Sequence, residues 1–257
     1  MSRIAEAFSR GKAFIPFVTA GDPDLETTEQ LVLAMSSAGA DIIELGIPFS
    51  DPMAEGPVIQ AASARALTKG CTADQLFSLV ERLRTNIQTP LVFMTYYNPI
   101  FSYGAKQFLE SCSSCGIDGV IVPDLPFEEK NEFAPLCAAH GIELISLIAP
   151  TSKERIRAIA ADASGFLYCV SSLGVTGVRA EINTDISEMI GLVREVSTIP
   201  CAVGFGISTP AQARQMAALS DGAIVGSAIV RLVAEHGRDC VPVVRDYVAA
   251  MKQAIRE

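Results

Sequence analysis

The chain has no tryptophan and only two histidines among its 257 residues. Both histidines, His140 and His236, stand directly before a glycine at the expected ends of helices, where a positive charge would complement the helix dipole. Catalysis that depends on histidine is therefore not expected. The seven cysteines are an odd number, and only Cys112 and Cys115 have the spacing of a redox or metal site. Because no second pair follows, we expect structural thiols in a reducing compartment.

Positive charge is also scarce. Twenty Lys and Arg residues against 29 Asp and Glu residues give a formal net charge of −9, and no basic cluster offsets it. This balance argues against nucleic acid or an anionic membrane as a partner. No apolar run approaches the roughly 20 residues of a membrane helix, and the start of the chain lacks the apolar segment of a signal peptide. We expect a soluble, cytoplasmic protein, in which a phosphate ligand would have to be held mainly by backbone amides.

Hydrophobic residues make up 49% of the chain and charged residues 19%, which is enough apolar material for a substantial core. Short apolar runs alternate with helical segments, and the runs end near Val18, Leu45, Thr95, Pro123, Leu147, Val170, Val203 and Val225. Buried strands that alternate with helices form a parallel sheet, and eight such units close into a (β/α)8 barrel. The rival fold is an open doubly wound sheet, which would need a glycine-rich fingerprint after the first strand. Residues 19–23 do not supply one, and no linker divides the chain, so residues 1–257 are expected to form a single α/β domain, a TIM barrel.

Turn residues divide these units further. Thr72 is expected to cap a helix over Ala73–Arg84. The residues from Tyr96 to Pro99 are expected to form the exit loop of the third strand. A long polar loop over 171–185 is expected to precede a helix that begins at Ile186.

The stretch from Asp41 to Gln60 holds the most informative acid. Glu44 is expected to be the only acid within a buried strand, and an unpaired buried carboxylate is costly. One alternative is a carboxylate at the wet end of the strand, paired with a neighbour. The other is a general acid/base, with Asp51 and Glu55 of the next loop closing over the same ligand.

In a barrel the active site lies at the carboxyl ends of the strands. Polar residues and glycines gather at those ends, namely Asp22, Glu44, Asp51, Glu55, Asn98, Asp124, Tyr168, Thr176, Gly177, Gly206 and Ser227. The seventh and eighth strands end in Gly204-Phe205-Gly206 and Gly226-Ser227. Small residues there let backbone amides approach an anion, and the helix after Ser227 adds its dipole. We therefore expect a phosphate site at these two strand ends.

Several segments resemble one family closely. They are residues 17–23 (FVTAGDP), 44–60 (ELGIPFSDPMAEGPVIQ), 123–126 (PDLP), 174–177 (GVTG), 204–208 (GFGIS) and 226–230 (GSAIV). Together they resemble the tryptophan synthase α subunit over essentially the whole chain, and the 44–60 block is not a general barrel pattern.

The resemblance implies a retro-aldol lyase, which cleaves indole-3-glycerol phosphate to indole and glyceraldehyde 3-phosphate. It implies no cofactor in this chain. It also implies a partner, the tryptophan synthase β subunit, which carries pyridoxal phosphate, receives the indole and joins the chain in an α–β–β–α heterotetramer.

The resemblance also implies residue roles. Glu44 would protonate indole C3 and take the proton of the glycerol hydroxyl, and Glu55 would accept the indole N–H proton. Thr176 would steady that second carboxylate, and Asp51 would carry signals between subunits. The indole would lie against Phe17, Tyr168 and Phe205. The phosphate would bind at Gly177, Gly206, Gly226 and Ser227.

Glu55 departs from the family pattern, which has aspartate at this position. The extra methylene adds about 1.5 Å of reach, and a misplacement of about 1 Å can cost 100-fold in rate. The chain is therefore either an active lyase or a regulatory subunit that binds ligand and cleaves poorly. We favour the first, since Met53 and Gly56 leave the loop room to adjust. A more distant alternative is another sugar-phosphate barrel, such as an isomerase, against which residues 51–60 argue.

Overall fold

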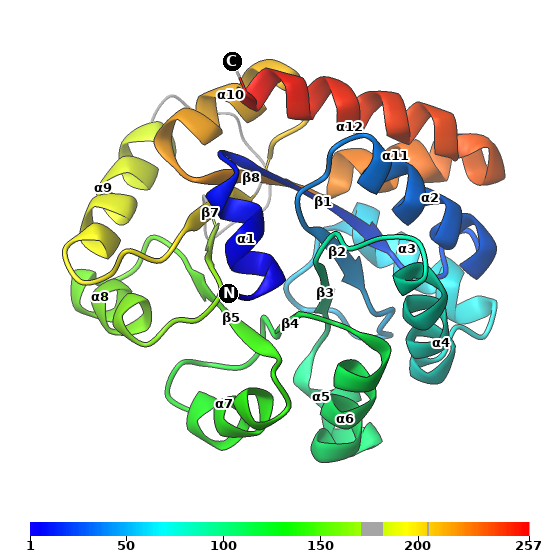
Figure 1. The fold of residues 1–257 in the computed structure, drawn as a ribbon, viewed down its shortest axis with the longest axis horizontal. Helices are drawn as coiled ribbons and strands as arrows, with labels where there is room; N and C mark the ends of the chain where they lie inside the picture. Colours follow the sequence, from blue (N-terminus) through cyan, green and yellow to red (C-terminus); the bar gives the residue numbers. More distant parts are fainter. Residues whose placement is uncertain (171–181, 205, 257) are drawn as a thin grey trace.

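The computed structural model describes residues 1–170, 182–204 and 206–256. Eight parallel strands close into a barrel in sequence order, and helices surround it (Figure 1). The strands are β1 (Ala13–Thr19), β2 (Ile43–Gly46), β3 (Leu91–Met94), β4 (Gly119–Ile121), β5 (Glu143–Ile148), β6 (Leu167–Val170), β7 (Cys201–Gly204) and β8 (Gly222–Val225). The predicted (β/α)8 barrel is confirmed. The expectation that residues 1–257 form one domain stays a prediction.

The helices follow the apolar periodicity of the sequence. They are α1 (Arg3–Ser9), α2 (Leu25–Ser37), α3 (Pro57–Thr68), α4 (Ala73–Arg84), α5 (Tyr97–Tyr103), α6 (Ala105–Cys115), α7 (Lys130–Ala139), α8 (Lys153–Ala161), α9 (Ile182–Arg194), α10 (Pro210–Leu219), α11 (Ser227–His236) and α12 (Cys240–Arg256), with a 3-10 turn, η1 (Gly237–Asp239). Thr72 caps α4 as predicted, and its hydroxyl accepts a hydrogen bond from the amide of Gln75.

Two loop predictions are wrong. Tyr97–Tyr103 forms helix α5 rather than a loop. The carboxylate of Asp124 accepts the first amide of this helix, at 2.9 Å from Tyr97 N, and Pro99 lies in the first turn, where its missing N–H is not needed. Helix α9 begins at Ile182, so the end of the expected 171–185 loop is helical.

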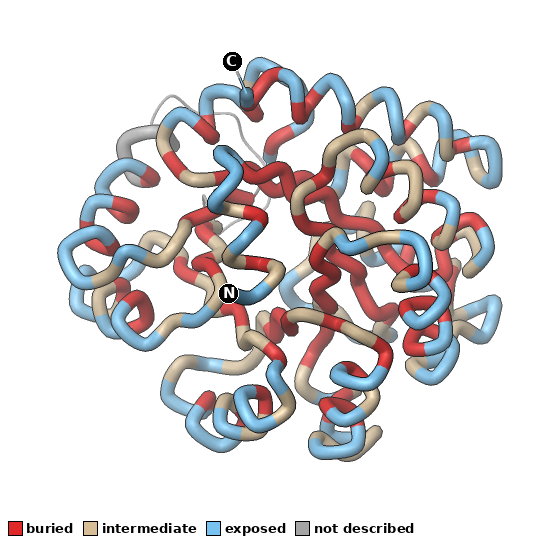
Figure 2. The backbone as a smooth tube through the Cα atoms, in the orientation of Figure 1, coloured by how far each residue is buried: buried red, intermediate tan, exposed pale blue. Residues whose placement is uncertain are grey.

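Side chains alternate between the inside of the barrel and the helical layer, as the two-residue period of a strand requires. One cluster fills the barrel and includes Ile15, Ile42, Val92, Ile121, Ile145, Phe166, Ala202 and Ile224. A larger cluster lies between the strands and the helices, and the buried residues concentrate in these two layers (Figure 2). The inward positions of β1 are therefore Ala13, Ile15, Phe17 and Thr19.

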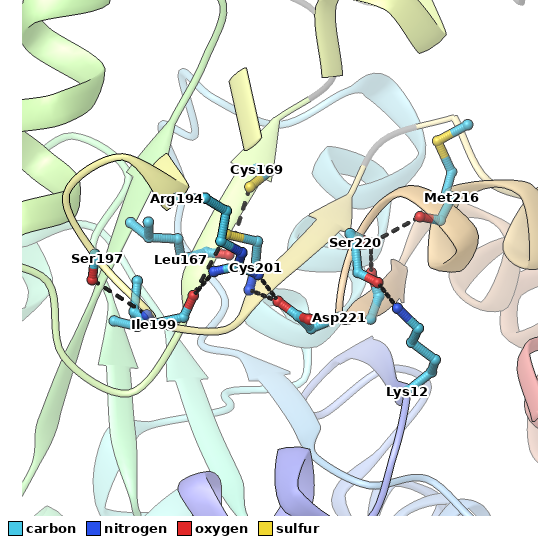
Figure 3. Close-up of polar contacts among 11 residues, drawn as sticks. Lys12, Leu167, Cys169, Arg194, Ser197, Ile199, Cys201, Met216, Ser220 and Asp221 are labelled. Atoms are coloured by element: carbon cyan, nitrogen blue, oxygen red, sulfur yellow. Dashed lines mark hydrogen bonds and ion pairs between the residues drawn. The ribbon is translucent and has the colours of Figure 1, made fainter. Parts of the chain in front are cut away.

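The amino-terminal end of the barrel is closed by α1 and by polar contacts. Ile4 and Ala7 of α1 belong to the inner cluster. At the start of β7 and β8, the carboxylate of Asp221 accepts the amide of Cys201 at 2.8 Å and pairs with Arg194 (Figure 3). These polar groups therefore have structural partners. In such barrels the active site lies at the opposite end, at the carboxyl ends of the strands.

The seven cysteines are free thiols, and six of them are buried. Burial raises the pKa of the Cys112 thiol well above its usual value, and that of Cys115 to about 11. In the part of the chain that the structure describes, no group of three His, Cys, Asp or Glu residues could hold a metal ion. No helix among the described residues is long and apolar enough to cross a membrane.

Candidate active site

Glu44 lies in β2, beside Phe17 of β1 and Val92 of β3 in the strand register. The residue is 1% exposed, and among the described residues neither of its carboxylate oxygens has a hydrogen-bond partner. Burial, and then the nearby charge of Glu55, raises the pKa of Glu44 from 4.5 to about 8. The carboxyl group therefore keeps its proton at neutral pH. A carboxyl group that is 1% exposed does not lie at the wet end of the strand, and a protonated one has the state of a general acid.

Glu55 lies in the loop between β2 and α3 and is half-buried. Burial raises the pKa of its carboxyl group from 4.5 to about 7. Its charge also raises the pKa of Glu44, so the two groups share one site. Because the pKa of Glu44 is the higher of the two, a single proton on the pair lies mainly on Glu44 and the negative charge mainly on Glu55. One acid and one base thus lie together at the carboxyl-terminal end of the strands, which we call the mouth of the barrel.

Two hydrogen bonds hold the backbone on both sides of the Glu55 side chain. The hydroxyl of Tyr96 accepts the amide of Ala54 at 2.9 Å, and the side-chain amide of Gln60 donates to the carbonyl of Glu55 at 2.8 Å. Tyr96 is buried and packs its ring against Phe49, with ring centroids 5.2 Å apart. The pKa of Tyr96 is raised to about 12, chiefly by burial and in part by the charges of Glu55 and Asp124, so it keeps its proton. Sequence reasoning missed Tyr96, which is 42 residues from its partner.

Phe17 and Tyr168 line the mouth, and each ring lies against a glycine of the next strand. A Cβ atom at Gly46 would lie 2.6 Å from the ring of Phe17. A Cβ atom at Gly204 would lie 2.6 Å from the ring of Tyr168. Phe17 also belongs to an apolar cluster with Ala62 of α3 and Val230 of α11. The charge of Glu44, after burial, raises the pKa of Tyr168 well above its usual value, so this neutral ring lies close to Glu44.

Gly206, Gly226 and Ser227 lie at the ends of β7 and β8, as predicted. Gly226 precedes α11 without a side-chain cap, and Ser227 is its first residue, so the amides of the first turn point out of the helix. Gly206 has a φ of +70°, which a residue with a side chain rarely adopts. Neutral amides and a helix dipole suit an anion. Thr176, Gly177 and Phe205, the other residues expected here, lie outside the described residues.

The other predicted acids at this end have polar partners. Asp22 is buried and makes a two-point ion pair with Arg65 of α3, at 2.8 and 2.7 Å. This pair joins the first loop to the helix that follows Glu55. Asp124 holds the start of α5, and Asn98 is exposed on that helix. Asp51 is exposed, and one of its carboxylate oxygens accepts the hydroxyl of Ser50 at 2.5 Å.

Among the described residues Glu44 is the one acid that is buried within a strand, but it is not the only strand acid. Glu143 opens β5 at the amino-terminal end of the barrel, and burial raises its pKa as well. A cleft of about 930 Å³ at the same end is lined by residues that include Arg10, Asp41 and Lys252. Lys252 is paired there with Asp41 at 2.5 Å. Neither feature adjoins the Glu44–Glu55 pair, and the amino-terminal end of such barrels serves stability.

One protein family matches the chain over nearly its whole length. Residues 5–256 match the family described as tryptophan synthase alpha chain. The tryptophan synthase alpha chain of Caldanaerobacter subterraneus subsp. tengcongensis is 49% identical over 246 residues, which cover 95% of this chain and 94% of that protein. The corresponding chain of Geobacter sulfurreducens is 48% identical over 266 residues, covering 99% of each.

Solved structures resemble the chain over the same length. Tryptophan synthase subunit alpha from Legionella pneumophila superposes with a TM-score of 0.90 at 38% identity, covering 100% of this chain and 99% of that one. A chain of the tryptophan synthase complex from Pyrococcus furiosus gives a TM-score of 0.85 at 35% identity, covering 95% and 99%.

Proposed function

The chain belongs to the tryptophan synthase alpha chain family, and on that premise we propose that Glu44 and Glu55 are its two catalytic carboxylates. The reaction is the retro-aldol cleavage of indole-3-glycerol phosphate to indole and glyceraldehyde 3-phosphate, a step of tryptophan biosynthesis. The observation that carries the assignment is the pair itself: a buried Glu44 without a hydrogen-bond partner among the described residues, with a pKa of about 8, beside a Glu55 with a pKa of about 7.

The first half of the reaction needs one proton given and one taken. Protonated Glu44 donates its proton to indole C3, and ionised Glu55 accepts the proton of the ring nitrogen. The product is the tautomer of the substrate in which C3 is tetrahedral. Both transfers start from the singly protonated pair, in which Glu44 holds the proton.

The second half returns both protons. The Glu44 carboxylate removes the proton from the hydroxyl next to the ring, the carbonyl of glyceraldehyde 3-phosphate forms, and the bond between C3 and the side chain breaks. The electron pair moves through the ring to the nitrogen, which recovers its proton from Glu55. Indole leaves with the new hydrogen on C3, and both carboxyl groups regain their initial states.

The apolar mouth supports the binding of the indole. Phe17, with its neighbours Val58, Ile59 and Met94, offers an apolar surface close to Glu44, and Tyr168 lies on the side of β6. The low polarity that raises the pKa of Glu44 is the same environment that accepts an aromatic ring. We assign Phe17, Tyr168 and Phe205 to this pocket.

The phosphate belongs at β7 and β8. The amides around Gly206, Gly226 and Ser227, together with Gly177, would hold the dianion without a basic side chain, in keeping with a net charge of −9. Thr176 would position Glu55.

The β subunit of tryptophan synthase is the partner, and we expect pyridoxal phosphate in that subunit and an α–β–β–α heterotetramer. Exposed apolar side chains support docking at the site end of the barrel: Met53 is 83% and Phe101 72% exposed. Both follow strands whose carboxyl ends form the site. Asp51 lies two residues from Met53 and is suited to report contact with the partner.

Indole release tests the proposal. The purified chain, with the β subunit saturating, should form indole and glyceraldehyde 3-phosphate in equal amounts, and Glu44→Gln should reduce this by about 10²–10⁴-fold. A Glu44→Gln variant that retains more than about a tenth of the wild-type rate would remove Glu44 from the mechanism. The second candidate, a regulatory subunit, is favoured if wild-type protein binds the substrate and activates the β subunit without cleavage.

A further inference from the structure

Thr19 ends β1 with a buried hydroxyl that has no hydrogen-bond partner among the described residues. The residue is 3% exposed. Buried hydroxyl groups are almost always hydrogen-bonded, because burial without a partner costs free energy. Only four buried side-chain nitrogen or oxygen atoms in the described part of the chain lack a hydrogen-bond partner. Three of them are Thr19 Oγ1 and the two carboxylate oxygens of Glu44.

Thr19 and Glu44 face the same space. Ala13, Ile15 and Phe17 alternate into the barrel along β1, so Thr19, two residues further, also points inward. It pairs in register with Gly46, and Phe17 pairs with Glu44. The two unpartnered side chains are thus diagonal neighbours on adjacent strands at the mouth. Neither bonds to the other, which leaves both free for a polar ligand.

The order of the strands indicates which part of the substrate lies next to Thr19. The barrel closes with β8 next to β1 and β1 next to β2. The phosphate is assigned to β7 and β8, and the reacting carbon lies beside Glu44 on β2. The glycerol chain that joins the two must therefore cross the end of β1, which is Thr19.

We propose that the Thr19 hydroxyl hydrogen-bonds the middle hydroxyl of the glycerol chain; this inference rests on the function proposed above. The substrate has two free hydroxyl groups between its ring and its phosphate. Glu44 takes the one next to the ring, which becomes the aldehyde. The other stays on glyceraldehyde 3-phosphate, nearer the phosphate, and a neutral hydroxyl group suits it because no proton is transferred there. Thr19 is thus a residue that recognises the hydroxylated chain.

The substitution Thr19→Val tests this contact, because valine keeps the shape and the β-branch and removes only the hydroxyl. With the β subunit saturating, kcat/KM for indole-3-glycerol phosphate should fall by about 10- to 100-fold, since the middle hydroxyl is then left unpaired. Indole-3-propanol phosphate has the same ring, chain length and phosphate but neither hydroxyl. Its inhibition constant should change less than about threefold. Thr19→Ser keeps the hydroxyl and should recover most of the loss.

Thermal stability separates recognition from a structural role. Thr28 is a matched control: it is also buried, but its hydroxyl donates to Asp24 O at 2.8 Å and accepts the amide of Gly21 at 3.0 Å. Thr28→Val should lower the Tm of the free chain, whereas Thr19→Val should leave the Tm unchanged or raise it, because it removes an unsatisfied group.

The proposal is overturned if Thr19→Val keeps kcat/KM within about threefold of wild type, or if it weakens indole-3-propanol phosphate as much as the substrate. A Thr19→Val chain with a lowered Tm and equal losses for both ligands would likewise show a structural role. Glu44→Gln, assayed in the same experiment, distinguishes a failure of the Thr19 proposal from a failure of the proposed function. If Glu44→Gln is inactive and Thr19→Val is normal, only the Thr19 contact is wrong. If Glu44→Gln is itself active, the proposed function of the pair is wrong.

Discussion

Replacing Glu44 by Gln should stabilise the free chain while it abolishes cleavage. The pKa of Glu44 is raised from 4.5 to about 8, so the folded state holds the proton over a pH range in which the unfolded chain releases it. The stability that this proton provides is complete below pH 4.5 and is lost as the pH rises towards 8. Glutamine has nearly the same shape and never ionises, so the stability of the Glu44→Gln chain does not decline in this pH range.

The size of the effect follows from the two pKa values. Each pH unit between 4.5 and 8 costs the wild type about 1.36 kcal/mol, so at pH 7 the loss is about 3 kcal/mol. Protonated glutamic acid and glutamine would both lack a partner among the described residues, so that cost cancels in the comparison. For a chain of this size, about 3 kcal/mol corresponds to a rise in Tm of roughly 6–12 °C.

Thermal unfolding of both proteins at several pH values provides the assay. Glu44→Gln should match the wild type at pH 4 and exceed it increasingly up to pH 8. An exposed acid, Glu110 on α6, provides the control: Glu110→Gln should shift stability by no more than about 0.5 kcal/mol at any pH. A Glu44→Gln gain that is absent at pH 8, or equal at pH 4 and pH 8, would refute the buried, protonated state of Glu44.

Three further outcomes follow from the site. The rate of a single turnover should rise with pH through about 7, as Glu55 ionises, and fall through about 8, as Glu44 loses its proton; a flat pH profile would contradict this order. Tyr96→Phe should slow cleavage about tenfold, because it releases the Ala54 amide beside Glu55. Tyr103→Phe is the control: the Tyr103 hydroxyl donates to the exposed Asp74, and its loss should leave the rate unchanged. Equal rates in the two variants would count against the Tyr96–Ala54 hydrogen bond as a support for Glu55. Gly206→Val should raise KM for the substrate more than about tenfold in steady-state assays, because its φ of +70° is strained for valine, and an unchanged KM would count against the phosphate site.

The strands were predictable from the sequence because each is a short apolar run with turn residues on both sides. Helix α5 was not, since Tyr97-Asn98-Pro99 has the composition of a loop. Its first amide is satisfied by Asp124, a residue from the next strand end, so the helix depends on a tertiary contact. Local patterns do not contain such information.

The site residues likewise fall into those that the sequence predicts and those that only tertiary contacts reveal. Glu44 was recognisable because an acid in an apolar strand is costly, and Glu55 because it follows in a loop at the same end of the barrel. The contacts that place Glu55 were not recognisable. Tyr96 reaches Ala54 across 42 residues of sequence, and the Asp22–Arg65 pair spans 43. Thr19 also gives no signal as a residue type, since threonine is common in strands; only its missing partner reveals it.

Single-turnover cleavage by Glu55 variants tests the central claim most directly, because Glu55 is the position at which the chain departs from its family. Wild type, Glu55→Asp and Glu55→Gln would be compared with indole-3-glycerol phosphate and saturating β subunit. If Glu55 accepts the ring N–H proton, Glu55→Gln slows cleavage by about 100-fold or more, and Glu55→Asp is no faster than wild type, because the tethered loop already fits the longer side chain. Equal rates for wild type and Glu55→Gln would contradict the two-carboxylate mechanism, and Asp51 would then be the next carboxylate to test.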